Sequence, residues 1–362
     1  MTLSILSLGV LLVGAILQQP SFASSATNPR QDMQIVQSFP SIRIGAKAVQ
    51  EFKANDTSTL SVTFSPDGSK LLTTSSAGLT KVWDKSGKQT LEFKQGDNII
   101  WAAAFSPDGM QIITGAQDKV ARLWDIQGQL LTEFTGHKDW VNSVHFSPDG
   151  QTILTASSDG TARLWNLKGE LLREFNGHQG KVWSACFSPN GRLIATASSD
   201  GTAIVWDLQG RIIKKLQGHT DWVRQVVFSP DGKLIATASN DGIARLWNLD
   251  GETIAQFKGH RSVVRNVGFS PDGQFLATTS QDRTVRLWNL QGRELDKLEG
   301  HKDWVIGLSF SPDGKYMVTS SSDTTVKFWN ISEMRRLDSP GSVQRPLTNR
   351  RSVSDVELSP SD

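Results

Sequence analysis

Short runs of apolar and alternating residues, separated by turn residues, recur along most of the chain. LIATAS (193–198) is a short apolar run, TARLWNL (161–167) alternates between polar and apolar side chains, and LLREF (171–175) forms a third type. Runs of this length with turn signals every ~8–12 residues are typical of strands in all-β proteins. No stretch after residue 48 has helical periodicity. The pattern therefore predicts an all-β fold.

A repeat of 41 residues organises these expected strands. Its marker is Phe-Ser-Pro-Asp-Gly, a turn sequence in which Pro fixes φ and Gly accepts a positive φ. The marker begins at Phe64, Phe105, Phe146, Phe187 (as FSPNG), Phe228, Phe269 and Phe310. A tryptophan followed by Asp or Asn keeps the same spacing, at Trp83, Trp124, Trp165, Trp206, Trp247, Trp288 and Trp329. Seven units in register predict a repeat architecture.

The Gly-His, Asp-Gly and Trp-Asp elements of these units resemble the WD40 repeat family. The similarity covers about residues 48–330, and the likeness among the units resembles WD40 arrays common in cyanobacteria and other filamentous bacteria. The resemblance implies a single seven-bladed β-propeller of four-stranded antiparallel blades.

The phase of the repeat predicts how the ring closes. Residues 48–53 align with later fourth strands, whereas the last unit, roughly 301–329, supplies only three strands after its own His. We therefore expect residues 48–53 to pair with the strand that carries Trp329, because this pairing removes the open edge of the array.

Five units contain a His, a Thr, an Asp and a Trp at fixed spacing. The first three side chains have the composition of a catalytic triad, but a catalytic site is normally single and this set occurs five times. The resemblance implies instead a buried hydrogen-bond network that joins the loop, strand and turn of each blade to the indole N–H. The sets are His137, Thr155, Asp159 and Trp165; His178, Thr196, Asp200 and Trp206; His219, Thr237, Asp241 and Trp247; His260, Thr278, Asp282 and Trp288; and His301, Thr319, Asp323 and Trp329.

Two units depart from this set. The second unit has Gly96 at the His position, and the first has Asn55 and Ala77 at the His and Asp positions. The first unit keeps only Thr73 and Trp83. We therefore expect blade one, and secondarily blade two, to be the softest part of the ring.

His145 and Cys186 occupy equivalent positions in neighbouring units, where a thiolate–imidazole pair is conceivable. The other units carry ordinary strand residues there, and packed sheets lie about 10 Å apart, so we interpret both as strand residues. A single cysteine excludes an internal disulfide framework and a CxxC site. No metal-ligand or Gly-rich phosphate motif appears. We predict no catalytic residue, no metal and no cofactor.

Five tryptophans lie outside the repeat signature, three or five residues past the His position. Two arginines occupy the second of these positions in other units. The resemblance implies that both positions face the narrow end around the central channel, where partners dock, and aromatic residues with Arg are enriched in binding hot spots. The alternative is that the indoles pack sideways on neighbouring loops and seal the ring. The predicted partner-binding residues are Trp101, Trp140, Trp183, Trp222, Arg224, Arg265 and Trp304.

Charge adds one exclusion. The 38 basic and 36 acidic residues give a formal net charge of +2, and no block of like charge indicates a nucleic-acid surface. Residues 331–362 lose the period and are rich in Ser, Pro and Arg, which predicts a disordered tail. We expect the propeller itself to be monomeric.

The N-terminus predicts a location. Residues 3–17 are mostly apolar, and no charged side chain precedes Arg30. Fifteen helical residues span about 22 Å, short of a ~30 Å hydrocarbon core, and Pro20 with small residues follows as in a signal peptide. We expect residues 1–26 to be a signal peptide or membrane anchor and 27–47 a linker, with an apolar segment packed on the domain as a third alternative. The protein is then exported (periplasmic or extracytoplasmic) or tethered to a membrane through the uncleaved segment, and cytoplasmic if the start is mis-assigned.

These features together predict a non-catalytic WD40 scaffold that binds a protein or peptide on its Trp- and Arg-rich face. A sensor domain of a larger signalling protein is the nearest alternative. A small-ligand or glycan-binding propeller could use the same tryptophans as stacking platforms. An enzyme is not expected, because nothing asymmetric marks one catalytic blade.

Overall fold

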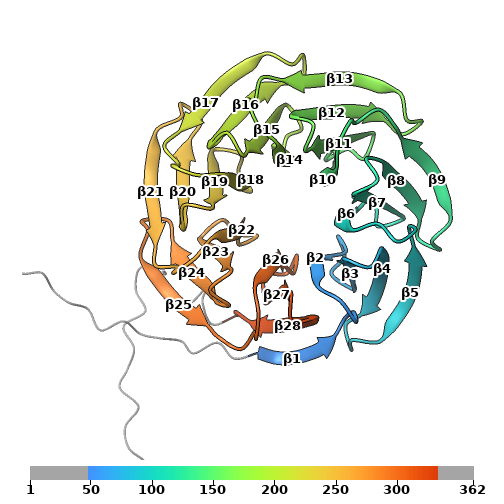
Figure 1. Ribbon diagram of the computed structural model, residues 1–362. Helices are drawn as coiled ribbons and strands as arrows, with labels where there is room; N and C mark the ends of the chain where they lie inside the picture. The colour runs from blue at the N-terminus through green and yellow to red at the C-terminus, as the bar shows by residue number, and fades with distance from the viewer. Residues whose placement is uncertain (1–47, 333–362) are drawn as a thin grey trace, which may run out of the picture. The chain divides into compact units, whose positions relative to one another are not determined.

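The computed structural model describes residues 48–332, which form a closed ring of 28 strands without a helix in that range (Figure 1). The expectations for residues 1–26 and 27–47, and for 333–362 of the predicted tail, lie outside the described residues. In chain order the strands are β1 (Ala48–Lys53), β2 (Thr59–Phe64), β3 (Lys70–Ser75), β4 (Leu79–Asp84), β5 (Gln89–Lys94), β6 (Ile100–Phe105), β7 (Gln111–Ala116), β8 (Ala121–Asp125), β9 (Leu130–Phe134), β10 (Val141–Phe146), β11 (Thr152–Ser157), β12 (Thr161–Asn166), β13 (Leu171–Asn176), β14 (Val182–Phe187), β15 (Leu193–Ser198), β16 (Thr202–Asp207), β17 (Ile212–Gln217), β18 (Val223–Phe228), β19 (Leu234–Ser239), β20 (Ile243–Asn248), β21 (Thr253–Lys258), β22 (Val264–Phe269), β23 (Phe275–Ser280), β24 (Val285–Asn289), β25 (Glu294–Leu298), β26 (Val305–Phe310), β27 (Tyr316–Ser321) and β28 (Thr325–Asn330).

The strands form seven four-stranded antiparallel blades. Blade 1 is β2–β5, and blades 2 to 6 are β6–β9, β10–β13, β14–β17, β18–β21 and β22–β25. Blade 7 contains β26–β28 and β1. The first strand of each blade lines the central opening, and the last lies at the periphery (Figure 1). The predicted fold class is confirmed.

The two ends of the described chain meet in blade 7. Strand β1 pairs antiparallel with β28, with Phe52 opposite Val326. Lys327 forms an ion pair with Glu51 across this seam. The Phe52 ring lies 4.7 Å from the ring of Trp83 in blade 1, centroid to centroid, so β1 also packs on the next blade. The predicted closure of the ring is therefore confirmed.

The repeated turn closes the hairpin between the first two strands of each blade. In blade 3, Ser147 Oγ donates to Asp149 Oδ1 (2.6 Å), and the Gly150 N–H donates to Ser147 O (2.9 Å). Gly150 has a φ of +71°, which a residue without Cβ adopts without strain. The Gln151 N–H donates to the same Asp149 oxygen (3.0 Å). These bonds explain why the Ser, Asp and Gly recur together.

The core consists of seven apolar clusters, one between each pair of adjacent blades. Between blades 4 and 5, for example, Val205 and Leu216 pack with Val223 and Trp247. Ile331, which the sequence assigned to the tail, is buried in the cluster between blades 6 and 7. Each blade is therefore stabilised mainly by its two neighbours.

Candidate functional site

The His-Thr-Asp-Trp sets are continuous buried hydrogen-bond chains. In blade 3, the Trp165 indole N–H donates to Thr155 Oγ1 (2.9 Å), and that hydroxyl lies 2.7 Å from His137 Nε2. His137 Nδ1 lies 2.8 Å from Asp159 Oδ2. The chain is satisfied when Nδ1 carries the proton of a neutral imidazole, since the hydroxyl then donates to Nε2.

Burial and hydrogen bonding set the charges of this chain in blade 3. Burial lowers the pKa of His137 below its ordinary 6.5, although the carboxylate beside it pulls in the opposite direction. Burial tends to raise the pKa of Asp159, but hydrogen bonds from His137, the Lys138 amide and Thr161 outweigh it and hold the pKa well below its usual range. The imidazole is therefore neutral and the carboxylate charged at neutral pH.

The other four complete sets repeat this geometry. The indole nitrogen to Thr oxygen distances are 2.8–2.9 Å, and the imidazole to Thr oxygen distances are 2.7–2.8 Å. Each His and Thr is buried or nearly so, although His260 and Asp241 also line a surface hollow. Residues 48–332 contain no cluster of His, Cys, Asp and Glu suited to a metal ion. The arrangement links the loop, strand and turn of each of these blades to the indole N–H.

In blade 2, part of the network is formed by Gln95, a residue that the alignment of the repeats did not identify. Thr114 Oγ1 donates to Gln95 Oε1 (2.7 Å) and accepts from Trp124 Nε1 (2.9 Å). Gln95 immediately precedes Gly96, the residue aligned with His, so its amide reaches the Thr from one position earlier. The sequence signal that could have identified this contact is an amide side chain, Gln95, directly before the position where the His is missing.

Blade 1 has the least complete network. The Trp83 indole N–H donates to Thr73 Oγ1 (2.9 Å), and the Asn55 amide reaches only Thr59 Oγ1 (3.1 Å). The repeat tryptophans of blades 1 and 2 are 6% and 7% exposed, against 1–2% in the other five blades. The expected softness of these two blades stays a prediction.

His145 and Cys186 do not form a reactive pair. Burial lowers the pKa of His145 to about 4 and raises the pKa of Cys186 to about 12, so both side chains are neutral at pH 7. No hydrogen bond joins them among the described residues. A thiolate nucleophile needs a lowered pKa, which is the opposite of what burial causes here.

The seven residues predicted to bind a partner are hereafter called the Trp/Arg face, and four of their five tryptophans stack in pairs across blade boundaries. The Trp101 ring of blade 2 stacks on Trp140 of blade 3 with centroids 5.5 Å apart, and Trp183 of blade 4 stacks on Trp222 of blade 5 at 5.8 Å. Lys181 Nζ of blade 4 lies 5.3 Å from the Trp140 ring centroid. Stacking of this kind contributes to the packing between blades, as the sealing alternative expects.

Arg224 extends the second stack. Its guanidinium carbon lies 4.5 Å from the Trp183 ring centroid and 4.8 Å from that of Trp222. Its Nε–H donates to Asn240 Oδ1 (2.7 Å). Burial, with the nearby charge of Arg265, lowers the pKa of Arg224 to about 10, so it remains a cation at neutral pH. Arg224 is thus held in place by cation–π contacts.

Two members of the Trp/Arg face are open to solvent. Trp222 is 40% exposed and Trp304 is 46% exposed. Trp304 has the same local turn as the other two tryptophans three residues past the His, with its N–H donating to Asp303 Oδ1 (2.7 Å). In each stacked pair, the tryptophan three residues past the His position contacts the residue five past the His position of the preceding blade. For Trp304 the residue at that position is Arg265, which has no indole. Within residues 48–332 the Trp304 ring makes no stacking or cation–π contact.

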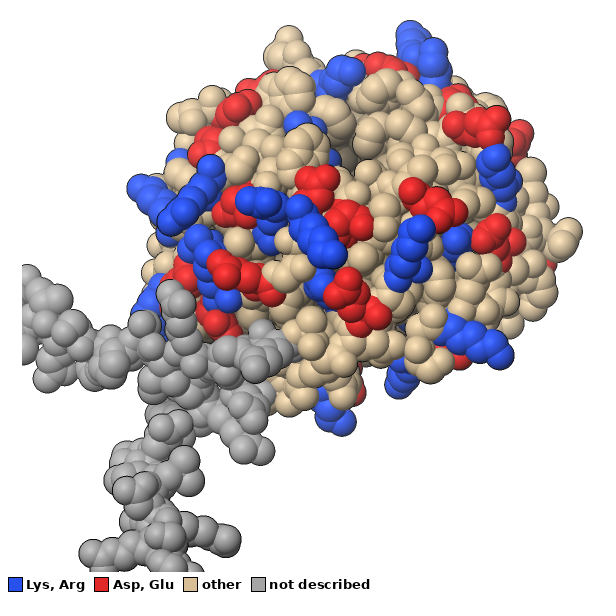
Figure 2. All heavy atoms as spheres, turned by 60° about the horizontal axis from the view of Figure 1, so that its bottom comes forward, with Lys and Arg blue, Asp and Glu red and all other residues tan. Residues whose placement is uncertain are grey.

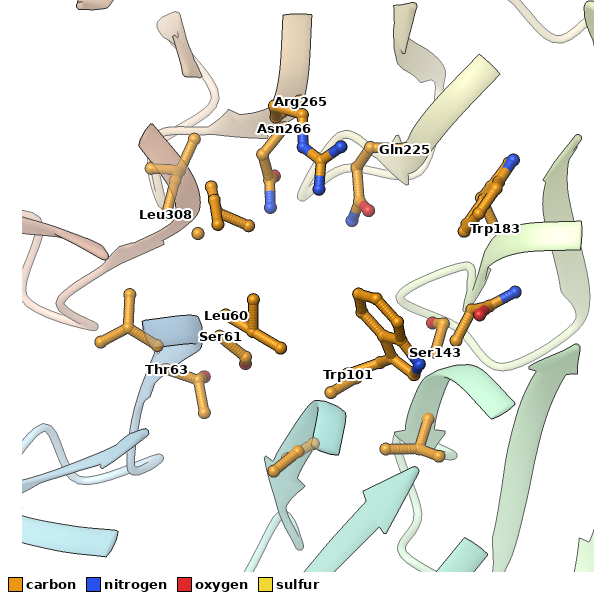
Figure 3. A pocket seen from close by; sticks show the side chains of 18 of the residues that line it. Leu60, Ser61, Thr63, Trp101, Ser143, Trp183, Gln225, Arg265, Asn266 and Leu308 are labelled. Atoms are coloured by element: carbon orange, nitrogen blue, oxygen red, sulfur yellow. The ribbon is translucent and has the colours of Figure 1, made fainter. Parts of the chain in front are cut away.

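A cavity of about 360 Å³ occupies the centre of the ring (Figure 3). Residues from all seven innermost strands line it, including four members of the Trp/Arg face: Trp101, Trp183, Arg224 and Arg265. These four side chains come from four different blades and meet at one central cavity.

The outer surface carries charges of both signs. Figure 2 shows Lys and Arg interspersed with Asp and Glu on the displayed side, without a large area of one sign. In the described part of the chain no helix is long and apolar enough to cross a membrane.

Comparison with known proteins agrees with this architecture. The sequence matches the family described as the IFT122 first β-propeller over residues 36–207 and again over 166–356, two overlapping matches as expected for a repeated sequence. No curated protein matches it. The matches together span well over half of the chain, and the blades are complete and closed. The chain therefore belongs to the family of the IFT122 first β-propeller and is a seven-bladed β-propeller of the WD40 type.

Proposed function

We propose that this protein is a non-catalytic scaffold that binds a protein or peptide on the Trp/Arg face around the central channel. The observation that carries this proposal is the exposure of two indoles, Trp304 and Trp222, of which Trp222 stacks on the cavity-lining Trp183. The fold is a general protein-interaction type, and the His-Thr-Asp-Trp sets recur in five blades as internal hydrogen-bond networks.

The exposed indoles offer the binding energy that such a face requires. A tryptophan side chain presents up to about 250 Å², so 40–46% exposure leaves roughly 100 Å² of ring on each residue. Covering that area contributes about 2.5 kcal/mol per indole at 25 cal/mol per Å². Exposed tryptophans together with arginines on the same predicted face match the composition of binding hot spots.

The test compares two double variants in affinity capture with the intact protein immobilised and an extract of the source cells as the sample. Trp222→Ala with Trp304→Ala should abolish capture of a specific partner and leave the melting temperature nearly unchanged. Leu171→Ala with Ile212→Ala, on outer strands with 48% and 52% exposure, is the matched control and should retain the partner. Capture that survives the tryptophan changes would overturn the proposal, and unfolding caused by them would favour the sealing role.

A glycan is the second candidate ligand, because the Trp304 ring has no stacking partner within residues 48–332 and a sugar ring could cover it. Tryptophan fluorescence separates the two candidates. Quenching by oligosaccharides that Trp304→Ala removes, with no response to peptides, would favour the glycan reading.

We further propose that the propeller acts outside the cytoplasm or on a membrane surface. The support is the apolar segment at residues 3–17, followed by Pro20 and small residues. N-terminal sequencing of the protein purified from cells, with fractionation, tests this. A mature start near residue 26 in the exported fraction supports a cleaved signal, and an intact Met1 in the soluble cytoplasm contradicts the proposal.

A further inference from the structure

Arg265 is a cation without a counterion. It lies on β22, and its guanidinium extends from blade 6 into the open centre of the ring (Figure 3). Within residues 48–332 it makes no hydrogen bond, ion pair or cation–π contact. Arg224, in contrast, contacts the rings of Trp183 and Trp222 and is hydrogen-bonded to Asn240. Of the two arginines that line the cavity in residues 48–332, Arg265 is therefore the one free to bind an incoming group.

Two side-chain amides lie beside this guanidinium. Gln225 of blade 5 and Asn266 of blade 6 line the same cavity, and Figure 3 shows both directed toward its centre. Neither amide is hydrogen-bonded to another residue in the described range. An amide NH₂ and a guanidinium are both donors, so the three side chains can donate to one group of oxygens.

The cavity has positive charge and no negative charge to balance it. No Asp or Glu is among the described residues that line it, and His145 at its wall is neutral because burial lowers its pKa to about 4. Burial also lowers the pKa of Arg265 from its ordinary 12.5, which reflects the cost of holding a cation there without a partner. A bound anion would remove that cost.

We propose that the central channel binds the carboxylate of an Asp or Glu side chain that a protein partner inserts, with Arg265 as the ion-pair partner and the amides of Gln225 and Asn266 as further donors. The single free guanidinium favours a carboxylate, with one negative charge, over a phosphate, which carries nearly two at neutral pH. This inference rests on the proposed function, because the same face supplies the indoles that would hold the rest of the partner.

The experiment uses a display library of unmodified peptides selected on the intact protein. Each enriched peptide is synthesised in two forms that differ only by Glu→Gln or Asp→Asn at its acidic position. Binding of both forms to the wild-type protein, Arg265→Gln and Arg192→Gln is measured by fluorescence anisotropy. Arg192 is exposed on a turn of blade 4 outside the central cavity and is the matched control. Melting curves check that each variant is folded.

The expected result is an obligatory acidic residue. The amide peptide should bind the wild-type protein about 10- to 100-fold more weakly, the range for hydrogen bonds to charged groups. Arg265→Gln should weaken the acidic peptide by a similar factor and no longer distinguish the two forms. Asn266→Leu should weaken it less, and Arg192→Gln should behave as wild type.

Three other results would overturn the inference in distinguishable ways. Peptides that bind in a Trp222- and Trp304-dependent manner but ignore the Glu→Gln change leave the proposed function standing and remove the carboxylate. A phosphoserine peptide that binds at least tenfold more tightly than its Glu form shows that the site selects phosphate. Failure to enrich any peptide sensitive to Trp222→Ala and Trp304→Ala counts against both the inference and the proposed function.

Discussion

Replacing Thr155 by Val tests whether the network in blade 3 stabilises the ring. Valine keeps the branched shape but removes the hydroxyl, and Thr155 is fully buried, so water cannot take its place. Two groups lose their partner: the Trp165 indole N–H at 2.9 Å and His137 Nε2 at 2.7 Å. A buried polar group left without a partner costs about 1–3 kcal/mol, so we expect a loss of roughly 2–5 kcal/mol in the free energy of unfolding.

The matched comparison is Thr73→Val in blade 1. That hydroxyl serves only the Trp83 indole N–H, at 2.9 Å, so the same change should cost about 1–2.5 kcal/mol. Both variants are followed by urea titration and by melting, where 1 kcal/mol lowers the midpoint by about 2 °C in a domain of this size. Equal losses in the two variants, or a shift below about 1 °C for Thr155→Val, would refute the reasoning from orphaned partners.

Three further predictions concern the ring as a whole. Deleting residues 48–53 together with all preceding residues should lower the melting temperature of the entire ring, because β28 becomes an open edge and Phe52 no longer packs on Trp83. A truncation that removes only residues 1–47 is the control and should leave the melting temperature unchanged. Equal melting temperatures of the two truncated proteins would contradict the role of β1. His145→Val should be nearly neutral at pH 7 but stabilising by roughly 1–2 kcal/mol at pH 5: burial holds the pKa of His145 at about 4, below its ordinary 6.5, so this histidine costs stability as the pH falls from 6.5 toward 4. Urea titrations at both pH values measure this, and the equivalent Val227 shows that the position accepts valine; a gain that is the same at both pH values would exclude the titration. Amide hydrogen exchange should be fastest in blade 1, then in blade 2, since their networks are incomplete, and uniform protection across the seven blades would count against this.

The sequence predicted the fold because a repeat converts one blade into seven. A 41-residue period aligns turn, network and strand positions, and the excess strand at residues 48–53 has only one place to pair. The same alignment compares equivalent positions, so it could not find Gln95, which reaches Thr114 from a position one residue away from the His site. Side-chain length, not register, decides that contact.

Side-chain contacts between neighbouring blades were the second feature that the sequence could not predict. The sequence placed five tryptophans and two arginines on one face, but stacking of Trp101 on Trp140 depends on how far each indole reaches across a blade boundary. For the same reason Arg224 and Arg265 occupy equivalent positions in the repeat and yet differ in their surroundings. The first lies against Trp183, whereas the second has no such neighbour in the described structure.

The pairing of β1 with β28 also constrains how the chain is made. Glu51 and Lys327 are 276 residues apart, so β1 leaves the ribosome long before its partner strand exists. At the usual ~5–20 residues synthesised per second, residues 48–53 remain without their partner strand for on the order of tens of seconds, until β28 has been made. Blades 1 to 6 can form in that interval from local hairpins, but the ring cannot close until translation is almost finished. During synthesis this first strand must therefore be kept from pairing with other chains, a need that ends once β28 covers it.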